Sequence, residues 1–154
     1  MPMLITIISG GQTGVDQIAL RVAKELGYPT GGTAPKGWRT DDGPAPWLET
    51  EYGLKESDSS QYNVRTIQNV RDACMTVWFG DTLSPGGILT LRVARYEQTR
   101  REYPILINPV ADDLAVYLGT LFAIRMVNIA GNRLRTNPAA THNAEIVLRT
   151  VLVR

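Results

Sequence analysis

The stretch "IISGGQTGVDQ" (residues 7–17) joins an apolar run to an amphipathic segment, and three glycines lie at the junction. Before the glycines, residues 4–8 (LITII) form a short run rich in β-branched residues, which is typical of a buried strand. After them, apolar residues recur at the spacing of one helical face: Val15, Ile18, Ala19, Val22, Ala23 and Leu26. Gly27 follows, where a helix commonly ends on a glycine cap. The stretch is therefore predicted to be the turn from a first strand into a first helix.

The alternation of apolar runs and helical stripes continues along the chain. Strands are predicted at residues 30–33, 73–79 (ACMTVWF), 104–108 (PILIN) and 126–130 (MVNIA), the first of them weak. Helices are predicted between Ser57 and Asp72, from Ser84 to about Arg101, and along two later stripes. Thr141 is expected to be the N-cap of the last helix. The residues expected to face inward are Val64, Ile67 and Val70 on the first of these helices, Leu114, Ala115, Leu118, Leu121 and Phe122 on the third, and Ala144, Val147, Leu148, Val151 and Leu152 on the last.

Apolar strands separated by helices indicate βαβ units, in which parallel strands form one sheet with helices on both faces. Right-handed crossovers make this a doubly wound, Rossmann-like α/β sandwich of about five parallel strands. Numbered along the chain, the strands are expected in the order 2-1-3-4-5 or a close variant. The length of 154 residues fits one domain over residues 1–154.

The composition excludes some classes of protein. Sixteen basic and fifteen acidic side chains leave a net charge of +1, which is too little to hold nucleic acid or a membrane surface by bulk charge. An anionic ligand must then be held by local groups. The single cysteine, Cys74, excludes an intrachain disulfide and a cysteine zinc site, and its place in a predicted strand indicates a buried, inert thiol.

The start of the chain lacks the charged segment and the cleavage site of a signal peptide. No apolar stretch reaches the roughly 20 residues that span a bilayer. We therefore expect a cytoplasmic protein.

Residues 34–56 do not follow the alternation. Three prolines (Pro35, Pro44 and Pro46), two tryptophans (Trp38 and Trp47) and the charged residues Lys36, Arg39, Asp41 and Asp42 lie in this segment. Loops beyond about 12–15 residues in compact domains are usually functional or disordered, and two tryptophans argue against disorder. The segment is predicted to be a long functional loop. The alternative is an ordered Ω-type loop packed by its own aromatic side chains.

The glycine turn after the first strand has the features of an anion site. In an open parallel sheet, ligands bind at the carboxyl ends of the strands, where the strand order reverses. Glycines let a ligand approach the backbone, and a helix N-terminus offers free N–H groups with partial positive charge. Gly10, Gly11, Gln12, Thr13 and Gly14 are therefore candidate phosphate-binding residues. The alternative is a tight turn in which glycine serves packing alone.

Known phosphate-binding motifs do not fit this turn. A G-x-G-x-x-G motif from Gly10 would need glycine at Gln12 and Val15, and a P-loop would need glycine and lysine at Val15 and Asp16. The acidic residue that holds a ribose after the second strand of a dinucleotide fold is also missing, since Gly31, Gly32 and Thr33 stand there. Binding of NAD in the usual mode is not expected, whereas a phosphate-bearing ligand is.

Two further turns fall at the same predicted sheet edge. Ser84-Pro85-Gly86-Gly87 opens a helix, and Thr90 lies one turn inside it, so a second glycine-opened helix N-terminus could hold the same ligand. Arg133, after Gly131 and Asn132, could bind a phosphate through two hydrogen bonds; its alternative is a solvated loop arginine.

Ionisable residues give weaker signals for catalysis. His142 is the only histidine and has no serine or cysteine partner that the sequence can identify, so a hydrolase triad has no support. Asp16, in the first turn of the first helix, complements the helix dipole or contacts a ligand. One adjacent acidic pair, Asp41 and Asp42, is weak evidence for a metal, and no metal site is predicted.

Several of these segments together resemble the family known as putative molybdenum carriers, within the Rossmann-like group that includes the "lonely guy" phosphoribohydrolases. Residues 8–16 (ISGGQTGVD) are similar to the family's opening motif, and Pro35-Lys36-Gly37 with Arg39, Asp42, Gly43 and Pro44 to its second. Asn69-Val70-Arg71-Asp72 resembles an "NVRDSD" segment with Ala73 and Cys74 in place of its last two residues. Gly86-Gly87 with Thr90 resembles "GGT", and Asn128-Ile129-Ala130-Gly131-Asn132-Arg133 resembles "NVAGPR" with Asn132 in place of proline.

The resemblance implies binding of the molybdenum cofactor, an anionic pterin phosphate, or of a nucleotide. Lys36 and Arg39 join the ligand-binding candidates, and Trp38 or Trp47 could supply a stacking surface. The phosphoribohydrolase relatives use P-G-G-x-G-T-x-x-E, in which Val93 here replaces the glutamate. Because a valine cannot transfer a proton, that activity is not expected.

We therefore predict a protein that binds a phosphorylated small molecule at the carboxyl ends of the strands. The expected partners are that ligand and further copies of the chain, with neither nucleic acid nor membrane. One alternative is an enzyme acting on a nucleotide, with Asp16, Asp42 or Asp72 as acid or base. Another is a regulatory or scaffolding module without a ligand.

Overall fold

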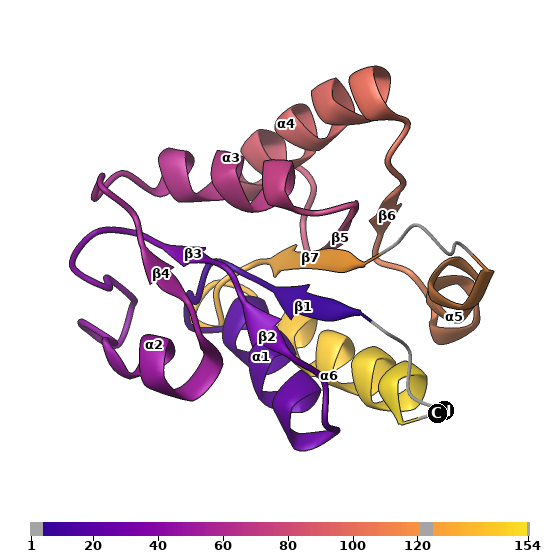
Figure 1. Cartoon of the computed structure of the whole chain (residues 1–154), viewed down its shortest axis with the longest axis horizontal. Coiled ribbons are helices and arrows are strands. Elements are labelled where there is room, and N and C mark those ends of the chain that lie inside the picture. The colour runs from indigo at the N-terminus through magenta and orange to yellow at the C-terminus, as the bar shows by residue number, and fades with distance from the viewer. Residues whose placement is uncertain (1–4, 121–124, 154) are drawn as a thin grey trace.

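The computed structural model of the chain describes residues 5–120 and 125–153. Five parallel strands form one sheet in the spatial order β2-β1-β7-β5-β6 (Figure 1). Their bounds are Thr6–Ile8 for β1, Thr30–Gly31 for β2, Met75–Phe79 for β5, Ile105–Ile107 for β6 and Met126–Gly131 for β7. The predicted α/β architecture, a parallel sheet flanked by helices, is confirmed.

Five helices cover the two faces of this sheet. The helices α1 (Val15–Glu25), α5 (Ala111–Thr120) and α6 (Pro138–Leu152) lie on one face, and α3 (Tyr62–Asp72) and α4 (Pro85–Arg101) on the other (Figure 1). Right-handed crossovers explain this division. The steps from β1 to β2 and from β6 to β7 run in one direction across the sheet, and the step from β5 to β6 runs in the opposite one. A reversal of direction moves the connecting helix to the other face.

The predicted strand order is corrected in one respect. Numbered along the chain, the observed order is 2-1-5-3-4, because β7, the last strand, lies between β1 and β5. The register places Ile7 beside Val127 on one side of β7 and Val77 beside Ile129 on the other. The carboxyl ends of β1, β7 and β5 are consequently neighbours, and β6 is an edge strand.

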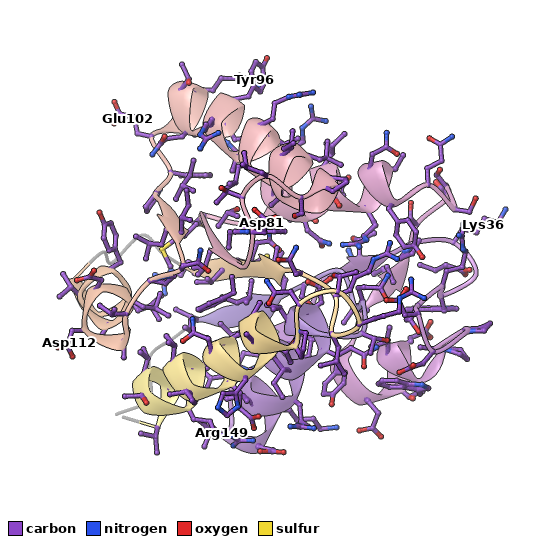
Figure 2. All side chains as sticks on the ribbon, turned by 180° about the vertical axis from the view of Figure 1, so that it is seen from behind. Lys36, Asp81, Tyr96, Glu102, Asp112 and Arg149 are labelled. Carbon is purple, nitrogen blue, oxygen red and sulfur yellow. The ribbon has the colours of Figure 1, made fainter. Side chains whose placement is uncertain are left out.

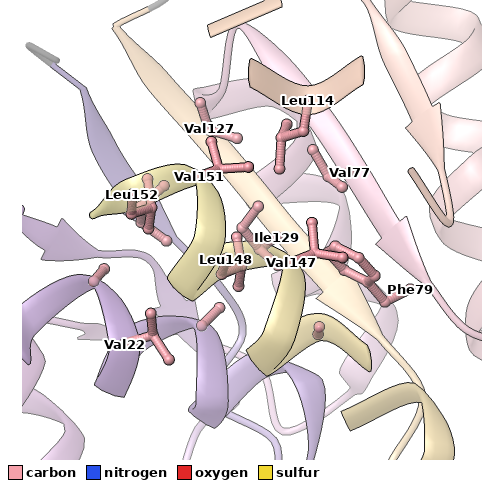
Figure 3. Close-up of a cluster of buried hydrophobic side chains, with 14 of the residues drawn as sticks. Val22, Val77, Phe79, Leu114, Val127, Ile129, Val147, Leu148, Val151 and Leu152 are labelled. Atoms are coloured by element: carbon pink, nitrogen blue, oxygen red, sulfur yellow. The ribbon is translucent and has the colours of Figure 1, made fainter. Parts of the chain in front are cut away.

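The main hydrophobic core lies between the sheet and the helices α1, α5 and α6. Alternate residues of the strands point into it, including Val77 and Phe79 of β5 and Val127 and Ile129 of β7 (Figure 3). The helical stripes predicted from the sequence face the same cluster. Its members from α1, α5 and α6 include Val15, Ile18, Ala19, Val22, Ala23, Leu114, Leu118, Ala144, Val147, Leu148, Val151 and Leu152.

Local signals place several helix ends correctly. Gly27 has a φ of 87°, and the N–H of Tyr28 behind it donates to Ala23 O, so α1 ends on a glycine cap as predicted. Ser84 caps α4, because its Oγ accepts from Gly87 N at 3.2 Å.

Other local predictions were wrong. The N-cap of α6 is Asn137, whose side chain accepts from Ala140 N, and Thr141 lies within the helix. On α3, Val70 is buried but Val64 is 39% exposed. Cys74 precedes β5 and is only half-buried. Leu4, Leu121 and Phe122 lie outside the described residues.

Residues 34–56 are not one long loop. They include the short helix α2 (Trp47–Tyr52) and extend between β3 (Thr33–Ala34) and β4 (Lys55–Glu56), which pair in parallel. A second hydrophobic cluster holds this substructure against α1; its members are Leu20, Ala34, Trp38, Ala45, Leu48 and Leu54. Trp38 thus packs within its own segment, as the alternative of an Ω-type loop proposes. The predicted weak strand at residues 30–33 is divided between β2 and β3.

None of the helices within residues 5–120 and 125–153 is long and apolar enough to cross a membrane.

Candidate functional site

A pocket of about 440 Å³ lies at the carboxyl ends of β1, β7 and β5, on the face covered by α3 and α4. Four segments line it: the turn into α1, the first turns of α3, the end of β5 with the start of α4, and the loop after β7. The lining residues are Gln12 and Asp16, then Tyr62, Arg65 and Thr66, then Trp78, Ser84, Pro85, Gly86, Leu89 and Thr90, and finally Ala130, Gly131, Asn132, Arg133 and Thr136. The size falls within the range of small-molecule sites.

The glycines of the turn after β1 are in contact with protein rather than open to the pocket. A Cβ atom at Gly10 would overlap the guanidinium of Arg65, and one at Gly11 would lie 2.7 Å from Leu48 Cδ1. At Gly14 it would lie 2.5 Å from the backbone nitrogen of Leu134. These glycines therefore let other segments of the chain approach the backbone closely. This agrees with the alternative of a tight turn in which glycine serves packing.

The first turn of α1 contains an anion of its own. The Oδ2 atom of Asp16 accepts from Gln12 N at 3.2 Å and lies 3.4 Å from Nη1 of Arg65. The Asp16 side chain is 4% exposed, and burial raises its pKa, against the opposing effects of the Arg65 charge and of backbone N–H groups. The carboxylate thus occupies the position at which the sequence analysis expects a ligand phosphate.

Gln12 connects the glycine turn to residues 34–56 and leaves one group free. Its Oε1 accepts from Thr13 N at 2.9 Å and from Asp41 N at 2.8 Å. These two bonds fix the orientation of the amide, because only the oxygen can accept. The Nε2 group is buried and has no acceptor among the described residues.

Three residues lining the pocket carry buried N–H donors without acceptors in the described part of the chain. The donors are Gln12 Nε2, Arg65 Nε and Trp78 Nε1. An unpaired buried donor costs about 1–3 kcal/mol, so three in one pocket need an explanation. A ligand rich in hydrogen-bond acceptors would supply one.

The start of α4 packs closely on Trp78. A Cβ atom at Gly87 would lie 2.5 Å from Asp81 O and 3.0 Å from Trp78 Cζ2, so this position requires glycine. At Gly86 it would meet only Trp78 Cη2, at an ordinary 3.7 Å. Gly86 therefore borders the pocket with space beside it, where backbone at a helix N-terminus can meet an anion.

Asn132 connects the two loops that form the inner wall of the pocket. Its Oδ1 accepts from Asp81 N at 2.7 Å and from Asn137 Nδ2 at 3.0 Å. Its Nδ2 donates to Ser84 Oγ at 3.0 Å, and its backbone N–H donates to Phe79 O at 3.1 Å. A proline here, as in the "NVAGPR" motif, would lack that N–H. The departure from the family motif thus adds hydrogen bonds at this wall.

Arg133 lies at the pocket and is held by a carboxylate. Its Nη1 is 3.0 Å from Asp41 Oδ1, which Arg135 approaches at 3.5 Å. The Asp41 side chain is 12% exposed. Arg133 is therefore held by an ion pair, and the alternative of a solvated loop arginine does not describe it.

The remaining candidates do not line the pocket. Lys36 points outward at the rim of residues 34–56 (Figure 2), and Arg39 is exposed near Tyr62. Thr13 Oγ1 donates to the exposed Asp42 at 3.4 Å. Asp72 accepts from Gln68 at the C-terminal end of α3. Of the three acid–base candidates, only Asp16 borders the pocket.

Sequence reasoning did not select Tyr62, Arg65, Thr66, Trp78 or Thr136. The sequence indicated that Trp78 is a core residue of a strand, and its side chain is indeed buried, at 2% exposed. Arg65 stood on a helix of ordinary polar composition. No local signal distinguishes these residues.

The described residues contain no cluster of three or more His, Cys, Asp or Glu side chains placed to hold a metal ion.

The comparisons with known proteins agree with this architecture. The family model "Circularly permutated YpsA SLOG family" matches residues 7–152. The chain is also similar to a crystal structure at 1.45 Å resolution of the putative molybdenum carrier protein from Syntrophus aciditrophicus SB, at 32% sequence identity. That match covers 99% of this chain and 97% of the other, with a TM-score of 0.82. No curated protein matches the sequence.

Circular permutation changes the chain order of strands without changing their places in the sheet. The last strand here, β7, occupies an interior position beside β1.

Proposed function

The chain belongs to the circularly permutated YpsA SLOG family, and from that premise we propose that it binds a phosphorylated small molecule in the pocket beyond β1, β7 and β5. The ligand is a nucleotide or the molybdenum cofactor, and the protein acts as its carrier. The printed name of the similar Syntrophus aciditrophicus protein supports the second of these ligands. In this proposal the protein is a single domain that works in the cytoplasm as a homo-oligomer and binds neither nucleic acid nor membrane.

The observation that carries the proposal is the set of three buried donors of Gln12, Arg65 and Trp78 that find no acceptor in the part of the chain that the structure describes. Phosphate oxygens are strong acceptors, and charge-assisted bonds to them are about twice as strong as neutral ones. The start of α4, with Gly86 and Thr90, adds a helix N-terminus that favours negative charge. Donors and dipole therefore favour the same kind of ligand.

Replacing Gln12 by glutamate tests this proposal. In Gln12→Glu one carboxylate oxygen can keep both backbone bonds of Oε1, while the other replaces the free N–H donor by a negative charge. We expect the affinity for a phosphorylated ligand to fall about 100-fold or more, since a charged hydrogen bond worth about 1.5–3 kcal/mol becomes a repulsion. Calorimetric titration with nucleoside monophosphates and the isolated pterin cofactor measures this, with unphosphorylated nucleosides for comparison.

Gln98→Glu is the matched control, because it makes the same charge change at an exposed position of α4 outside the pocket lining. Its affinity should equal that of the parent. Equal affinities of the parent for phosphorylated and unphosphorylated compounds would contradict the proposal, as would unchanged affinity in Gln12→Glu. Native mass spectrometry of the purified protein would identify a retained ligand and report the number of subunits.

A second candidate function, catalysis on the bound ligand, is favoured by Asp16 alone. Asp16 is part of the pocket lining, and burial raises the pKa of its carboxyl group; perturbed groups of this kind are common at catalytic sites. The carboxyl group of Asp16 is nevertheless already bonded within the protein, to Gln12 N and to Arg65.

Cleavage of a nucleotide to its free base is not expected. Val93 stands where the phosphoribohydrolases have a glutamate, and it is outside the pocket lining. Chromatography of nucleoside monophosphates incubated with the protein should show no base released above the rate without protein. Release at the rate of an authentic phosphoribohydrolase would contradict the carrier function and make Asp16 the first residue to replace.

A further inference from the structure

Three arginines surround the ring of Tyr62; Tyr62, Arg65 and Arg133 line the pocket, and Arg39 lies outside its lining. The guanidinium carbons of Arg39 and Arg133 each lie 5.2 Å from the ring centroid of Tyr62, and that of Arg65 lies 5.5 Å from it. We call Arg39, Arg65, Arg133 and Tyr62 the arginine cluster. The negative face of an aromatic ring attracts each cation, but it does not cancel three positive charges.

The carboxylates beside the arginine cluster only partly neutralise it. Asp16 pairs with Arg65, while Asp41 is shared between Arg133 and Arg135. Arg39 has no ion pair among the described residues; its Nη1 donates to Ser60 O at 3.4 Å. The three guanidinium groups of the cluster thus face two carboxylates, one of which Arg135 also approaches, and positive charge remains.

The N-terminus of α3 adds to this positive potential. Tyr62 is the first residue of that helix, its N-cap Gln61 makes no side-chain capping bond, and the first turn has no acidic residue. Partial positive charge at the helix end is therefore uncompensated within the helix. Independently, the buried Nε2 group of Gln12, which is 5% exposed and lines the same pocket, has no acceptor in the described part of the chain.

We propose that the arginine cluster and Gln12 form a second anion subsite, so that the pocket takes a ligand with two anionic groups. The inference rests on the proposed function and divides its donors: one phosphate is assigned to Trp78 and the start of α4, and the other anion to Gln12 and the arginine cluster. Gln12 follows β1 and Gly86 follows β5, with β7 between these strands. At about 4.8 Å per strand, β1 and β5 themselves are roughly 10 Å apart, so the groups that follow these two strands can hold two anions side by side. The second anion is a further oxyanion of the same ligand or a free one bound beside it.

Paired nucleotides test the inference. Adenosine 5′-monophosphate and adenosine 3′,5′-bisphosphate are titrated calorimetrically at two salt concentrations. We expect the bisphosphate to bind the parent at least about tenfold more tightly, with a steeper salt dependence, because its second phosphate gains charge-assisted hydrogen bonds. In a third arm, inorganic phosphate is added before the monophosphate; a rise in monophosphate affinity assigns the subsite to a free oxyanion.

Variants locate the subsite. Arg39→Gln removes an exposed charge that no carboxylate of the described residues pairs with, so it should fold normally and reduce the advantage of the bisphosphate. Arg65→Gln should abolish the advantage, but it leaves Asp16 buried without its cation, so a melting curve accompanies it. Arg92→Gln, an exposed arginine of α4 outside this pocket, should change nothing.

Equal binding of both nucleotides by the parent, with no effect of added phosphate, would overturn the second subsite and leave the proposed function standing. An advantage of the bisphosphate that survives Arg39→Gln and a folded Arg65→Gln would also overturn it. Failure of the parent to bind either nucleotide, when the pterin cofactor does bind, would reject nucleotides as ligands; the same variants are then measured with the cofactor.

Discussion

Gly14→Ala is expected to destabilise the protein by about 3–5 kcal/mol, because it combines backbone strain with overpacking. Gly14 has a φ of 130°, a conformation that residues with a Cβ rarely adopt. A Cβ atom here would lie 2.5 Å from Leu134 N and 2.7 Å from Asn132 O. Both contacts are backbone atoms of the loop after β7, which cannot rotate away as a side chain could.

The contact between these two segments organises the pocket as well as the fold. Val15 N donates to Asn132 O at 3.3 Å, and Leu134 N donates to Thr13 O at 3.0 Å. Separation of the segments would displace Arg133, which lies between Asn132 and Leu134, from the pocket. Loss of ligand affinity should therefore accompany the loss of stability.

Urea unfolding followed by circular dichroism measures the stability, with Gly27→Ala as the matched control. Gly27 also has a positive φ, 87°, but a Cβ atom there would meet nothing within 4 Å. Its replacement should cost only about 1–2 kcal/mol, the penalty of the left-handed conformation. Similar losses in the two variants would show that strain alone acts at Gly14 and that the close approach of the loop is not tight.

Asn132→Ala is expected to cost about 2–4 kcal/mol, since it removes three side-chain hydrogen bonds at a buried position. Asn132 is 8% exposed, so water cannot fully replace the amide. The N–H of Asp81 loses its acceptor, and Ser84 Oγ loses a donor just where α4 begins. For a chain of this length the loss corresponds to a fall in melting temperature of roughly 5–15 °C.

The same replacement should weaken ligand binding, because Asn132 holds the start of α4 against the loop that carries Arg133. Calorimetric titration below the melting temperature separates this effect from unfolding. Asn143→Ala, at an exposed position of α6, serves as control and should leave both quantities unchanged. A variant Asn132→Ala as stable as the control would mean that water replaces the three bonds, and the proposed wall would then have no energetic role.

Consecutive residues were enough to determine the local structure. The stripe from Val15 to Ala23 shows one face of α1 directly, because residues three and four apart lie on the same side of any α-helix. Gly27 was identified as a cap, and Ser84 as the start of a helix, for the same reason: the backbone groups at a helix end are satisfied by residues only a few positions away. The signal was weaker at α6, where Asn137 and Thr141 are both residue types that cap helices, and the sequence favoured the wrong one.

Glycine was the clearest signal of the site and the one most open to two interpretations. The sequence shows that something approaches the backbone at Gly10, Gly11 and Gly14, because only glycine permits such proximity. It does not show whether a ligand or another part of the chain approaches. In the structure these glycines meet Arg65, Leu48 and the backbone of Leu134, which are 37 or more residues away from them along the chain.

The sequence by itself thus determined the α/β class, the strand and helix segments, and the edge of the sheet where the turns meet. Tertiary structure alone decided that β7 lies between β1 and β5, since several short apolar runs fit an interior place equally well and strand pairing joins residues far apart. It also decided the pocket, where Trp78 is like any core residue except that its N–H has no acceptor among residues 5–120 and 125–153. Periodicity and capping depend on neighbours in sequence, whereas pairing, burial and unsatisfied donors depend on which distant segments come together.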